Sequence, residues 1–403
     1  MGGSPNVLSL LRPLLFFATV LLVVGGGHLY LYRRLVRDTT RRMGLRRLGG
    51  GVLLGLALGL VFARVAAALF HSYSGETLVF ISWCWMGFGL YLGISLAVLR
   101  GARRMRARFT KSAAAAESPE RRQFLARVAA GTAVASSSLV SGYGVWRAFE
   151  EPVLSELALV LPNLPRALDG LSIVQLSDVH IGTVLRRKFL EEAVARCNRL
   201  KPDLVAITGD LVDGSVPELL PIVSALQNLK SRYGTFFCTG NHEFYSGDVA
   251  WAAALERLGL TVLRNRFVRV GDAGASFDLV GVDDWGHKDS PEDHGYDLAQ
   301  ALQGRDPGRA SVLLAHQPAG FKNAAQAGVG LQLSGHTHGG QFFPFTALLG
   351  GIAALRLGVA PYTHGLYQEG ASRLYVHRGC GFWGPPMRVG SRPEIVKLTL
   401  MAG

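Results

Sequence analysis

The chain has 403 residues and a formal net charge of +13, so it is long enough for two domains or for one domain with a membrane region. The charge is uneven: residues 1–150 carry 19 Lys and Arg against 5 Asp and Glu, whereas residues 151–403 carry 23 against 24. A domain that binds nucleic acid carries the basic residues itself, so we expect no nucleic-acid partner for the near-neutral C-terminal part. The four cysteines form no C-x-x-C pair and do not identify the compartment.

Long apolar stretches dominate the N-terminal part. Leu14–Tyr32 has 19 residues without a charge, and Thr77–Leu99 has 23 residues without Lys, Arg or Asp. Each is close to the roughly 20 residues that cross a bilayer as a helix. Gly49–Tyr73 is interrupted only by Arg64, which we expect to reach the membrane surface or face a neighbouring helix. Residues 1–150 are therefore predicted to form a transmembrane region of about four helices, near residues 10–32, 49–73, 77–99 and 123–146.

The fourth stretch, Gln123–Trp146, is rich in Ala, Ser and Gly. Arg121-Arg122-Gln123-Phe124-Leu125 precedes it and resembles a twin-arginine export signal. Two positions depart from that signal, with Glu120 where Ser or Thr is usual and Ala126 where Lys is common. The alternative is that these arginines are only the cytoplasmic flank of a span.

Basic loops give the expected orientation. The loop at residues 33–47 has seven Arg and one Asp, the loop at residues 100–122 has eight Lys and Arg, and residues 71–76 between them have none. The positive-inside rule places both basic loops in the cytoplasm. If residues 123–146 span the membrane, the C-terminal domain lies outside the cytoplasm; if they lie on the surface, it lies inside. We expect an integral protein of a bacterial inner membrane with an extracytoplasmic C-terminal domain.

Residues 151–403 are predicted to form a layered α/β domain, which begins after Glu150-Glu151-Pro152. Strands are expected at residues 171–176, 204–208, 234–238, 311–315 and 331–333, and helices at residues 186–200 and 216–229. Open α/β sheets place their sites at the carboxyl ends of strands, where polar residues follow these apolar runs. Residues 267–282 and 373–400 show strands without intervening helices, which indicates a second, more antiparallel sheet packed on the first.

The polar residues that follow these strands form five motifs: Asp178-Val179-His180, Gly209-Asp210-Leu211-Val212-Asp213, Gly240-Asn241-His242-Glu243, His316 and Gly335-His336-Thr337-His338. Taken singly, each Asp or His is typical of a surface residue or a helix cap. Together they offer carboxylate, amide and imidazole ligands without a thiolate. Such a set suits a pair of Mn, Fe or Zn ions that hydrolyses phosphate esters.

The motifs resemble the calcineurin-like metallophosphoesterase family over most of residues 170–400, and more narrowly its membrane-anchored bacterial branch. The resemblance is carried by Gly240–Gly247, Gly335–Gln341, Leu374–Val376 with Gly379, and the segment from Gly384-Pro385-Pro386 to Pro393-Glu394-Ile395. It implies an α/β fold, a four-layer α/β/β/α sandwich. Some members of that branch resemble UDP-2,3-diacylglucosamine hydrolases, and others are exported by the twin-arginine route.

The resemblance also implies residue roles. Asp178, His180, Asp210 and His338 would hold the first metal, and Asp210, Asn241, His316 and His336 the second; His242 would be catalytic and Asp213 would orient it. Two ions about 4 Å apart need a carboxylate between them, which is the role implied for Asp210. Asp-x-His and His-x-His place alternate side chains on one side of extended backbone. Mn is favoured because the set has no thiolate, with Fe or Zn as alternatives.

One departure from the family bears on the substrate. An Arg follows the position of Asp213 in the protein Ser/Thr phosphatase branch, whereas this chain has Gly214, which suits a bulkier diester. Substrate-binding residues stay unknown. Gln341, Tyr245, His294 and His364 are candidates for shaping the cleft, although ordinary surface or structural roles are favoured for the last two.

These observations predict a membrane-anchored phosphohydrolase with two metal ions that cleaves a phosphodiester or pyrophosphate bond by attack of a metal-bridged hydroxide. The expected partners are the bilayer and a phosphorylated lipid or envelope substrate. Three alternatives stay open: a UDP-2,3-diacylglucosamine pyrophosphohydrolase with a cytoplasmic site, a non-catalytic metal-binding membrane scaffold, and a transporter with a phosphatase-like domain. The spans carry no row of acidic residues that would favour the transporter.

Overall fold

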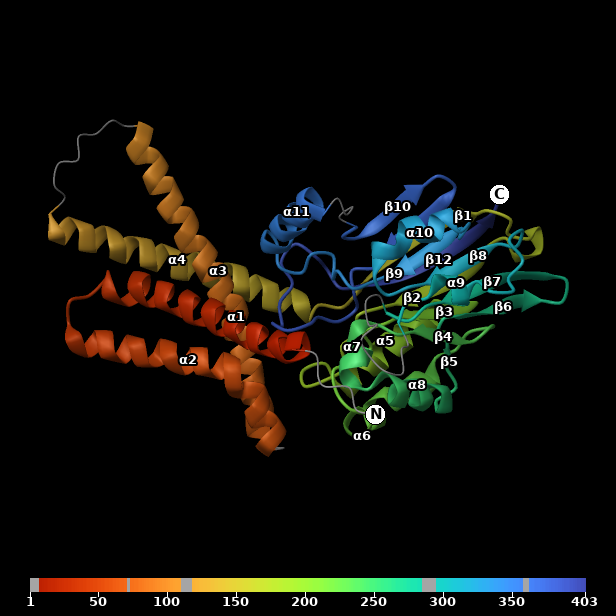
Figure 1. Ribbon diagram of the computed structural model, residues 1–403, viewed down its shortest axis with the longest axis horizontal. Coiled ribbons are helices and arrows are strands. Elements are labelled where there is room, and N and C mark those ends of the chain that lie inside the picture. The colour runs from red at the N-terminus through yellow and green to blue at the C-terminus, as the bar shows by residue number, and fades with distance from the viewer. Residues whose placement is uncertain (1–6, 71–72, 110–117, 285–294, 358–361) are drawn as a thin grey trace. The chain divides into compact units, whose positions relative to one another are not determined.

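The computed structural model describes residues 7–70, 73–109, 118–284, 295–357 and 362–403 (Figure 1). The chain forms two compact units, Met1–Gly144 and Val145–Gly403. The first contains long helices and the second contains both β-sheets. The division falls inside the fourth helix, so the last turn of that helix belongs to the second unit.

The first unit contains α1 (Val7–Leu31), which continues as a π-helical segment η1 (Tyr32–Arg37), followed by α2 (Met43–Phe70), α3 (Tyr73–Phe109) and α4 (Pro119–Ala148). Within the described residues, three segments are long and apolar enough to cross a membrane: Met43–Phe62, Gly75–Phe109 and Pro119–Ala148. The first expected span falls on α1, where many side chains lie outside the described part. The side chain of Arg64 also lies outside it.

Both basic loops are shorter than expected. Helical backbone continues from α1 through Arg37, and α3 continues for ten residues beyond Leu99 to Phe109. The prediction ended each helix where the apolar residues ended. Arginine is a good helix former, so a helix can extend past the apolar boundary when its charged side chains remain accessible to water.

The second unit contains two six-stranded sheets (Figure 1). In order across the first sheet lie β1 (Val153–Leu161), β12 (Glu394–Ala402), β2 (Leu171–Leu176), β3 (Leu204–Thr208), β4 (Thr235–Cys238) and β5 (Thr261–Val262). Across the second lie β10 (Gly365–Glu369), β11 (Ser372–Val376), β9 (Leu331–Ser334), β8 (Ser311–Leu314), β7 (Ala275–Gly281) and β6 (Arg266–Asp272). Strands β2 to β5 are parallel, as are the four central strands of the second sheet.

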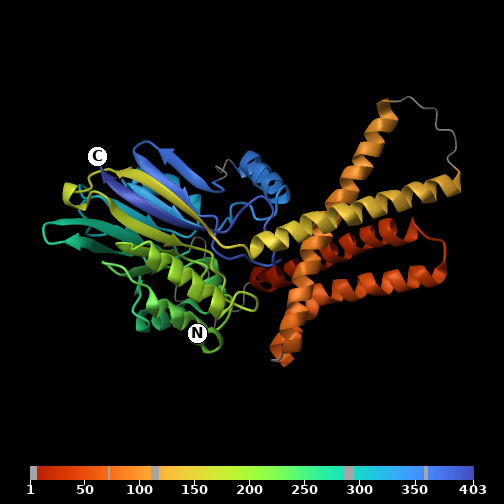
Figure 2. The ribbon, with the colours of Figure 1, turned by 180° about the vertical axis from the view of Figure 1, so that it is seen from behind.

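Helices cover the outer faces of the two sheets (Figures 1 and 2). On the first lie α5 (Arg187–Arg199), α6 (Val216–Val223) and α8 (Asp248–Arg257); on the second lie α9 (Leu298–Ala301) and α10 (Phe321–Gln326). The short α7 (Asn241–Ser246) follows β4, and α11 (Phe345–Leu357) follows β9. The helix expected at residues 216–229 is α6 followed by a 3-10 segment, Ser224–Asn228. Pro221 near the end of α6 lacks the N–H that a longer α-helix would use there.

Three buried clusters separate the four layers. Along β2, Val174 and Leu176 pack toward α5, α6 and α8, whereas Leu171 and Ile173 pack between the sheets. This alternation follows from the two-residue period of a strand. The third cluster joins the second sheet to α9 and α10, with Leu313 at its centre. The expected α/β/β/α architecture is therefore confirmed.

The expectation that residues 373–400 belong to the second sheet is wrong for β12. Strand β12 lies in the first sheet, where it pairs parallel with β1 and antiparallel with β2. Its Val396, Leu398 and Leu400 are buried between the sheets. Strand order depends on pairing between distant segments, which the local apolar pattern does not specify. Strand β1, which sequence reasoning did not identify, completes this edge.

Candidate active site

The predicted ligands lie in loops at the carboxyl ends of five strands. Asp178 and His180 follow β2, Asp210 follows β3, Asn241 follows β4, His316 follows β8, and His336 and His338 follow β9. Because β2, β3 and β4 are parallel to one another, and β8 and β9 likewise, the loops of each sheet gather at one edge. The structure brings side chains from both edges into one cluster.

Left-handed backbone marks these loops. Five of the seven predicted ligands have positive φ: Asp178 (51°), His180 (52°), Asp210 (51°), His336 (72°) and His338 (50°). Elsewhere in the described chain only three residues other than glycine share this conformation. Each such residue costs about 1–3 kcal/mol and persists only where the surroundings enforce it, as at functional sites. The strain is thus concentrated on the predicted metal ligands.

Asp178, His180 and His338 form the first ligand group, with ligand atoms within 4.8 Å of one another. His180 Nε2 lies 3.1 Å from His338 Nε2, and His338 Nε2 lies 3.4 Å from Asp178 Oδ1. All three residues are buried. Burial, reinforced by nearby His180 and Arg388, holds the pKa of His338 well below its usual range, so its imidazole is neutral and can act as a ligand.

Asp210, His316 and His336 form the second group. His316 Nδ1 donates to the Thr208 carbonyl at 2.8 Å, which leaves Nε2 facing Asp210 Oδ2 at 3.1 Å. His336 Nδ1 lies 3.0 Å from Asn241 Oδ1, so the amide joins this group. Desolvation by the surrounding loops, reinforced by the nearby His316, lowers the pKa of His336 to about 4 although part of the side chain is exposed, which keeps that imidazole neutral as well.

Asp210 lies between the two groups, as a bridging ligand must. Its Oδ2 is 3.1 Å from His316 Nε2 and 3.8 Å from His180 Nε2, and its Oδ1 accepts the backbone N–H of His242 at 2.9 Å. Burial opposes its charge, but His316 and His180 hold the pKa of the Asp210 carboxyl well below its usual range. The carboxylate therefore stays ionised and available between two cation positions.

One buried atom tests whether metal ions fit this cluster. Asp178 Oδ2 makes no hydrogen bond in the described structure. A buried polar atom without a partner costs about 1–3 kcal/mol, so this oxygen is expected to have a ligand. In the second group His316 Nε2 faces the Asp210 carboxylate at 3.1 Å, and the donors of both groups are oxygen and nitrogen only. The residues present therefore fit two divalent cations of the Mn, Fe or Zn type.

The Asp213 carboxylate forms hydrogen bonds with two histidines. Its Oδ1 accepts a hydrogen bond from His242 Nδ1 at 2.5 Å and another from His180 Nδ1 at 3.1 Å. The first contact is the one the resemblance implied; the second fixes the ring of a predicted ligand. Burial works against protonation of His180, but Asp213 and two further carboxylates raise its pKa to about 9. Asp213 therefore orients the predicted ligand His180 as well as the predicted catalytic residue His242.

Glu243 is a site residue to which sequence reasoning gave no role. Its buried carboxylate accepts backbone N–H groups of Gly240 (2.7 Å), Asp210 (3.0 Å), Leu211 (2.8 Å) and Val212 (3.3 Å). It thus ties the loop after β3 to the loop after β4. The available signal was a Glu three residues beyond Gly240, at the start of α7, where a capping carboxylate is common.

Arg388 is a second residue without a predicted role, although it lies in a segment that carries the resemblance. It is fully buried, and its guanidinium donates to the carbonyls of His338, Arg378 and Gly381 and to Ser391 Oγ. Burial lowers its pKa to about 10, where it is still charged at neutral pH. It joins the loop after β11 to the backbone of the ligand His338.

The remaining candidates have different positions. Tyr245 and Trp383 flank His242, with ring centroids 5.3 Å and 5.7 Å from the imidazole, and they are 70% and 44% exposed. Gln341 is buried and donates to the Trp383 carbonyl at 3.1 Å, so it supports that loop. His364 is exposed just before β10 and belongs to neither ligand group. His294 lies outside the described residues.

This fold and this cluster define a calcineurin-like phosphoesterase. The family model of that description matches residues 171–340. A zebrafish protein described as a transmembrane protein with metallophosphoesterase domain is 32% identical over 413 aligned positions, which cover 99% of this chain and 91% of the relative. The chain therefore belongs to the calcineurin-like phosphoesterase family, and the expectation of a metal-dependent phosphoesterase is confirmed at that level.

Two further relatives come from a mammal and a bacterium. A bovine protein of the same description is 40% identical over 281 residues, covering 67% of this chain and 62% of its own length. An uncharacterized metallophosphoesterase of Helicobacter pylori is 36% identical over 262 residues, covering 64% of this chain and 67% of its own length. Relatives thus occur in eukaryotes and bacteria. The narrower assignment to a bacterial UDP-2,3-diacylglucosamine hydrolase-like branch stays a prediction, as do the bacterial inner membrane and the extracytoplasmic orientation.

Proposed function

We propose that this protein is a membrane-anchored phosphohydrolase that uses two divalent metal ions to cleave a phosphodiester or pyrophosphate bond in a lipid or envelope substrate. The observation that carries the proposal is the meeting of two ligand groups at Asp210, together with the buried Asp178 Oδ2, which has no hydrogen-bond partner in the described structure. Mn is the metal we propose first, with Fe or Zn as alternatives, because the donors are oxygen and nitrogen.

When bound, two such ions supply a nucleophile from water at neutral pH and stabilise negative charge on phosphoryl oxygens. Asp178, His180 and His338 would hold one ion, and Asn241, His316 and His336 the other, with Asp210 shared. His242 has its Nδ1 bound to Asp213, and its Nε2 lies 4.0 Å from Asp210 Oδ2. Nε2 is thus directed at the cluster, where it can donate a proton to the departing oxygen.

An apolar rim supports a lipid substrate. Helix α11 begins seven residues after His338, and Thr346 Oγ1 donates to the Gly340 carbonyl at 3.0 Å, which attaches the helix to the ligand loop. Its exposed apolar side chains, at the i, i+3, i+4 and i+7 spacing of one helix face, are Phe345, Leu348, Leu349 and Ile352. Contiguous exposed apolar surface of this kind marks a membrane or ligand contact.

The end of α4 belongs to the second unit. Ala148, the last residue of α4, is buried in the cluster that covers the first sheet. The ring of Phe149 packs edge-on against Phe382 at 5.4 Å, one residue before Trp383. The last residues of the candidate span Pro119–Ala148 therefore pack as part of the second unit. A candidate span in the same chain supports a substrate that lies in or near a membrane.

Two alternatives predict different observations. A UDP-2,3-diacylglucosamine pyrophosphohydrolase requires a site that faces the cytoplasm. A non-catalytic scaffold would hydrolyse no substrate. The intact His242–Asp213 pair favours an enzyme over a scaffold, because a structural metal site needs no proton donor beside it.

The full chain in detergent, loaded with Mn, should hydrolyse bis(p-nitrophenyl) phosphate and release a head group from phospholipid in mixed micelles. The matched control is Asp210→Asn, which removes the bridging charge and should lower turnover at least about 10³-fold, the scale of losing a main electrostatic group. Chelation should abolish activity, and Mn should restore it. Full activity on the diester in the chelated protein, or in Asp210→Asn, would overturn the proposal.

A further inference from the structure

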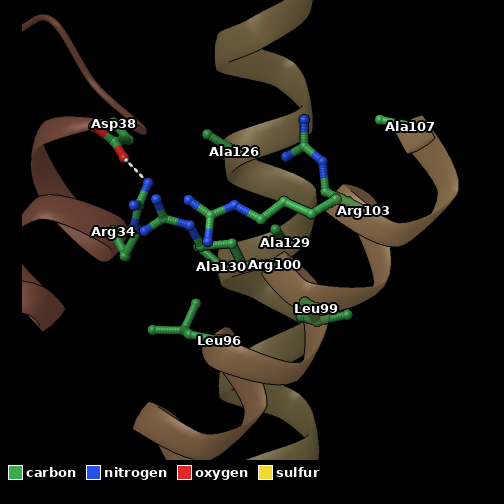
Figure 3. A pocket seen from close by; sticks show the side chains of 11 residues that line it. Arg34, Asp38, Leu96, Leu99, Arg100, Arg103, Ala107, Ala126, Ala129 and Ala130 are labelled. Carbon is green, nitrogen blue, oxygen red and sulfur yellow. Dashed lines mark hydrogen bonds and ion pairs between the residues drawn. The ribbon is translucent and has the colours of Figure 1, made fainter. Parts of the chain in front are cut away.

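A cavity of about 330 Å³ lies within the first unit, between η1, α3 and α4 (Figure 3). One side is lined by Arg34, Arg100, Arg103 and Arg104, together with Asp38. The other side is formed by short apolar side chains of α3 and α4, including Leu96, Leu99 and Ala130. Charged and apolar groups thus occupy opposite walls of the same cavity.

The charged wall has four arginines and one acidic residue. Asp38 pairs with Arg34 at 2.9 Å and with Arg37 at 3.6 Å, so its charge is already shared. Among the residues that the structure describes, Arg100 and Arg103 form no ion pair, and the Nε of Arg34 is buried without a hydrogen bond. Figure 3 shows the guanidinium groups of Arg34 and Arg100 pointing into the same space. Cations gathered in this way are stabilised when an anion lies between them.

The cavity lies where the helices change from apolar to basic. Arg100 and Arg103 come directly after the apolar residues 77–99 of α3, and Arg34 comes just after the apolar part of α1. The walls are held together, because Arg127 of α4 donates to the Thr39 carbonyl at 2.9 Å. Head groups of lipids lie at this level of a membrane protein, and basic pockets between helices on the cytoplasmic side suit phosphate head groups.

We propose that this cavity binds the phosphate head group of an anionic membrane lipid. The guanidinium groups of Arg34, Arg100 and Arg103 contact the phosphate, and the acyl chains lie along Leu96 and Leu99 of α3 and the alanines of α4. A free phosphate would satisfy the charged wall equally well but would leave the half-buried Leu99, Ala126 and Ala129 without an apolar partner in the cavity. The site is separate from the ligand groups around Asp210, so the inference does not depend on the proposed hydrolysis.

Native mass spectrometry of the full chain in detergent tests the proposal with three probes: phosphatidylglycerol, phosphatidylcholine with the same acyl chains, and inorganic phosphate. The pocket variant combines Arg100→Gln and Arg103→Gln. The control combines Arg41→Gln and Arg42→Gln, which removes the same charge from equally exposed positions that do not line the cavity. Each basic residue near a membrane surface contributes about 1 kcal/mol to anionic lipid binding, so the pocket variant should bind phosphatidylglycerol about 30-fold more weakly than the wild type.

Preference for phosphatidylglycerol over phosphatidylcholine in the wild type and the control, lost only in the pocket variant, supports the site. Equal weakening in both double variants, or equal binding of the two lipids, overturns it. Displacement of the lipid by inorganic phosphate at equal concentration overturns the lipid assignment. If the pocket variant does not fold, a second variant, Ala126→Phe, replaces it; this change keeps every arginine but fills part of the cavity next to the apolar wall. It should also weaken phosphatidylglycerol binding. Binding as strong as that of the wild type would contradict the proposal. Asp210→Asn should bind the lipid normally, which separates this test from that of hydrolysis.

Discussion

The strained ligand residues are stabilised by hydrogen bonds between neighbouring loops. Asp178 N–H donates to the Gly209 carbonyl at 3.1 Å, and His180 N–H donates to the Asp210 carbonyl at 3.1 Å. His336 N–H donates to Asp178 Oδ1 at 2.8 Å. Each loop therefore enforces the conformation of the next, and the site acts as one unit. A substitution that loosens one loop should be felt at ligands on the others.

His242→Ala tests the residue that acts on the leaving group. His242 lies near His180 and Asp210 in a third set of neighbouring ligand atoms, but it is not among the residues proposed to hold the ions. The variant should therefore retain two metal ions per chain, measured by inductively coupled plasma mass spectrometry. Loss of a general acid costs about 10²–10⁴-fold in rate, and most for poor leaving groups. A series of aryl phosphodiesters with different leaving-group pKa values measures how the loss in rate depends on the leaving group. An equal loss across the series, or loss of metal, would contradict the assigned role.

Glu243→Gln tests the carboxylate that joins two ligand loops. Glutamine has nearly the same shape, but its amide nitrogen cannot accept the backbone N–H groups that Glu243 binds. An unsatisfied buried donor costs about 1–3 kcal/mol, so the metal-free variant should unfold at a lower temperature than the wild type. Glu192→Gln, an exposed change on α5, is the control. Equal unfolding temperatures for the two variants would refute this role.

At the residue scale, sequence reasoning identified the groups with a direct chemical role and missed those that support them. Asp178, His180 and Asp210 stand in short motifs next to apolar strands, and such a pattern can be recognised. Glu243 and Arg388 are fully buried ionisable side chains. Because most Glu and Arg residues lie on the surface, the local sequence does not show that these two are buried. Their partners are backbone groups of loops far away in the sequence.

At the scale of elements, the segment between β11 and β12 depends on one side chain. Arg388 binds carbonyls on both sides of Gly379, a residue with φ of 84° that approaches Asp178 and His338. The segment has no regular secondary structure over residues 377–393, so these hydrogen bonds replace the ones a helix or strand would provide. The loop after β11 is therefore a structural part of the ligand site.

Arg388→Met should therefore destabilise the catalytic unit more than a surface change does. Methionine fills similar space but leaves several buried carbonyls without a donor, at about 1–3 kcal/mol each. The expected outcome is a lower thermal unfolding temperature together with weaker retention of one metal ion, since His338 loses its backbone support. Arg257→Met, an exposed change on α8, provides the comparison. Unchanged metal content would show that Arg388 does not position His338.

The sequence predicts a strand most accurately where the residues on both faces of that strand are buried. Strands β2 and β3 match their expected ranges, because every residue in them is buried and the apolar runs have sharp ends. Strand β1 has mostly exposed and half-buried residues, so its apolar pattern is weaker. The place of β12 could not be read locally, since Val396 and Lys397 pair with β2 residues more than 200 positions earlier.

At the scale of the whole molecule, the orientation of the catalytic unit decides which substrates it meets. A compartment-sensitive reporter fused after Gly403 should give an extracytoplasmic signal in intact cells, because residues 123–146 are expected to cross. The same reporter fused after Arg108, in the basic segment, should give a cytoplasmic signal. A cytoplasmic signal from both fusions would contradict the extracytoplasmic placement and favour pyrophosphates made inside the cell.

The position of β12 also bears on when the catalytic unit can fold. Ser155 of β1 and Glu394 of β12 contact each other although 239 residues separate them. While a ribosome is still making the chain, the first sheet lacks the strand that joins β1 to β2. Folding of this sheet is therefore completed only after residue 402 has emerged, and the chain remains open until then. The membrane helices, which are made first, can therefore insert before the catalytic unit has folded.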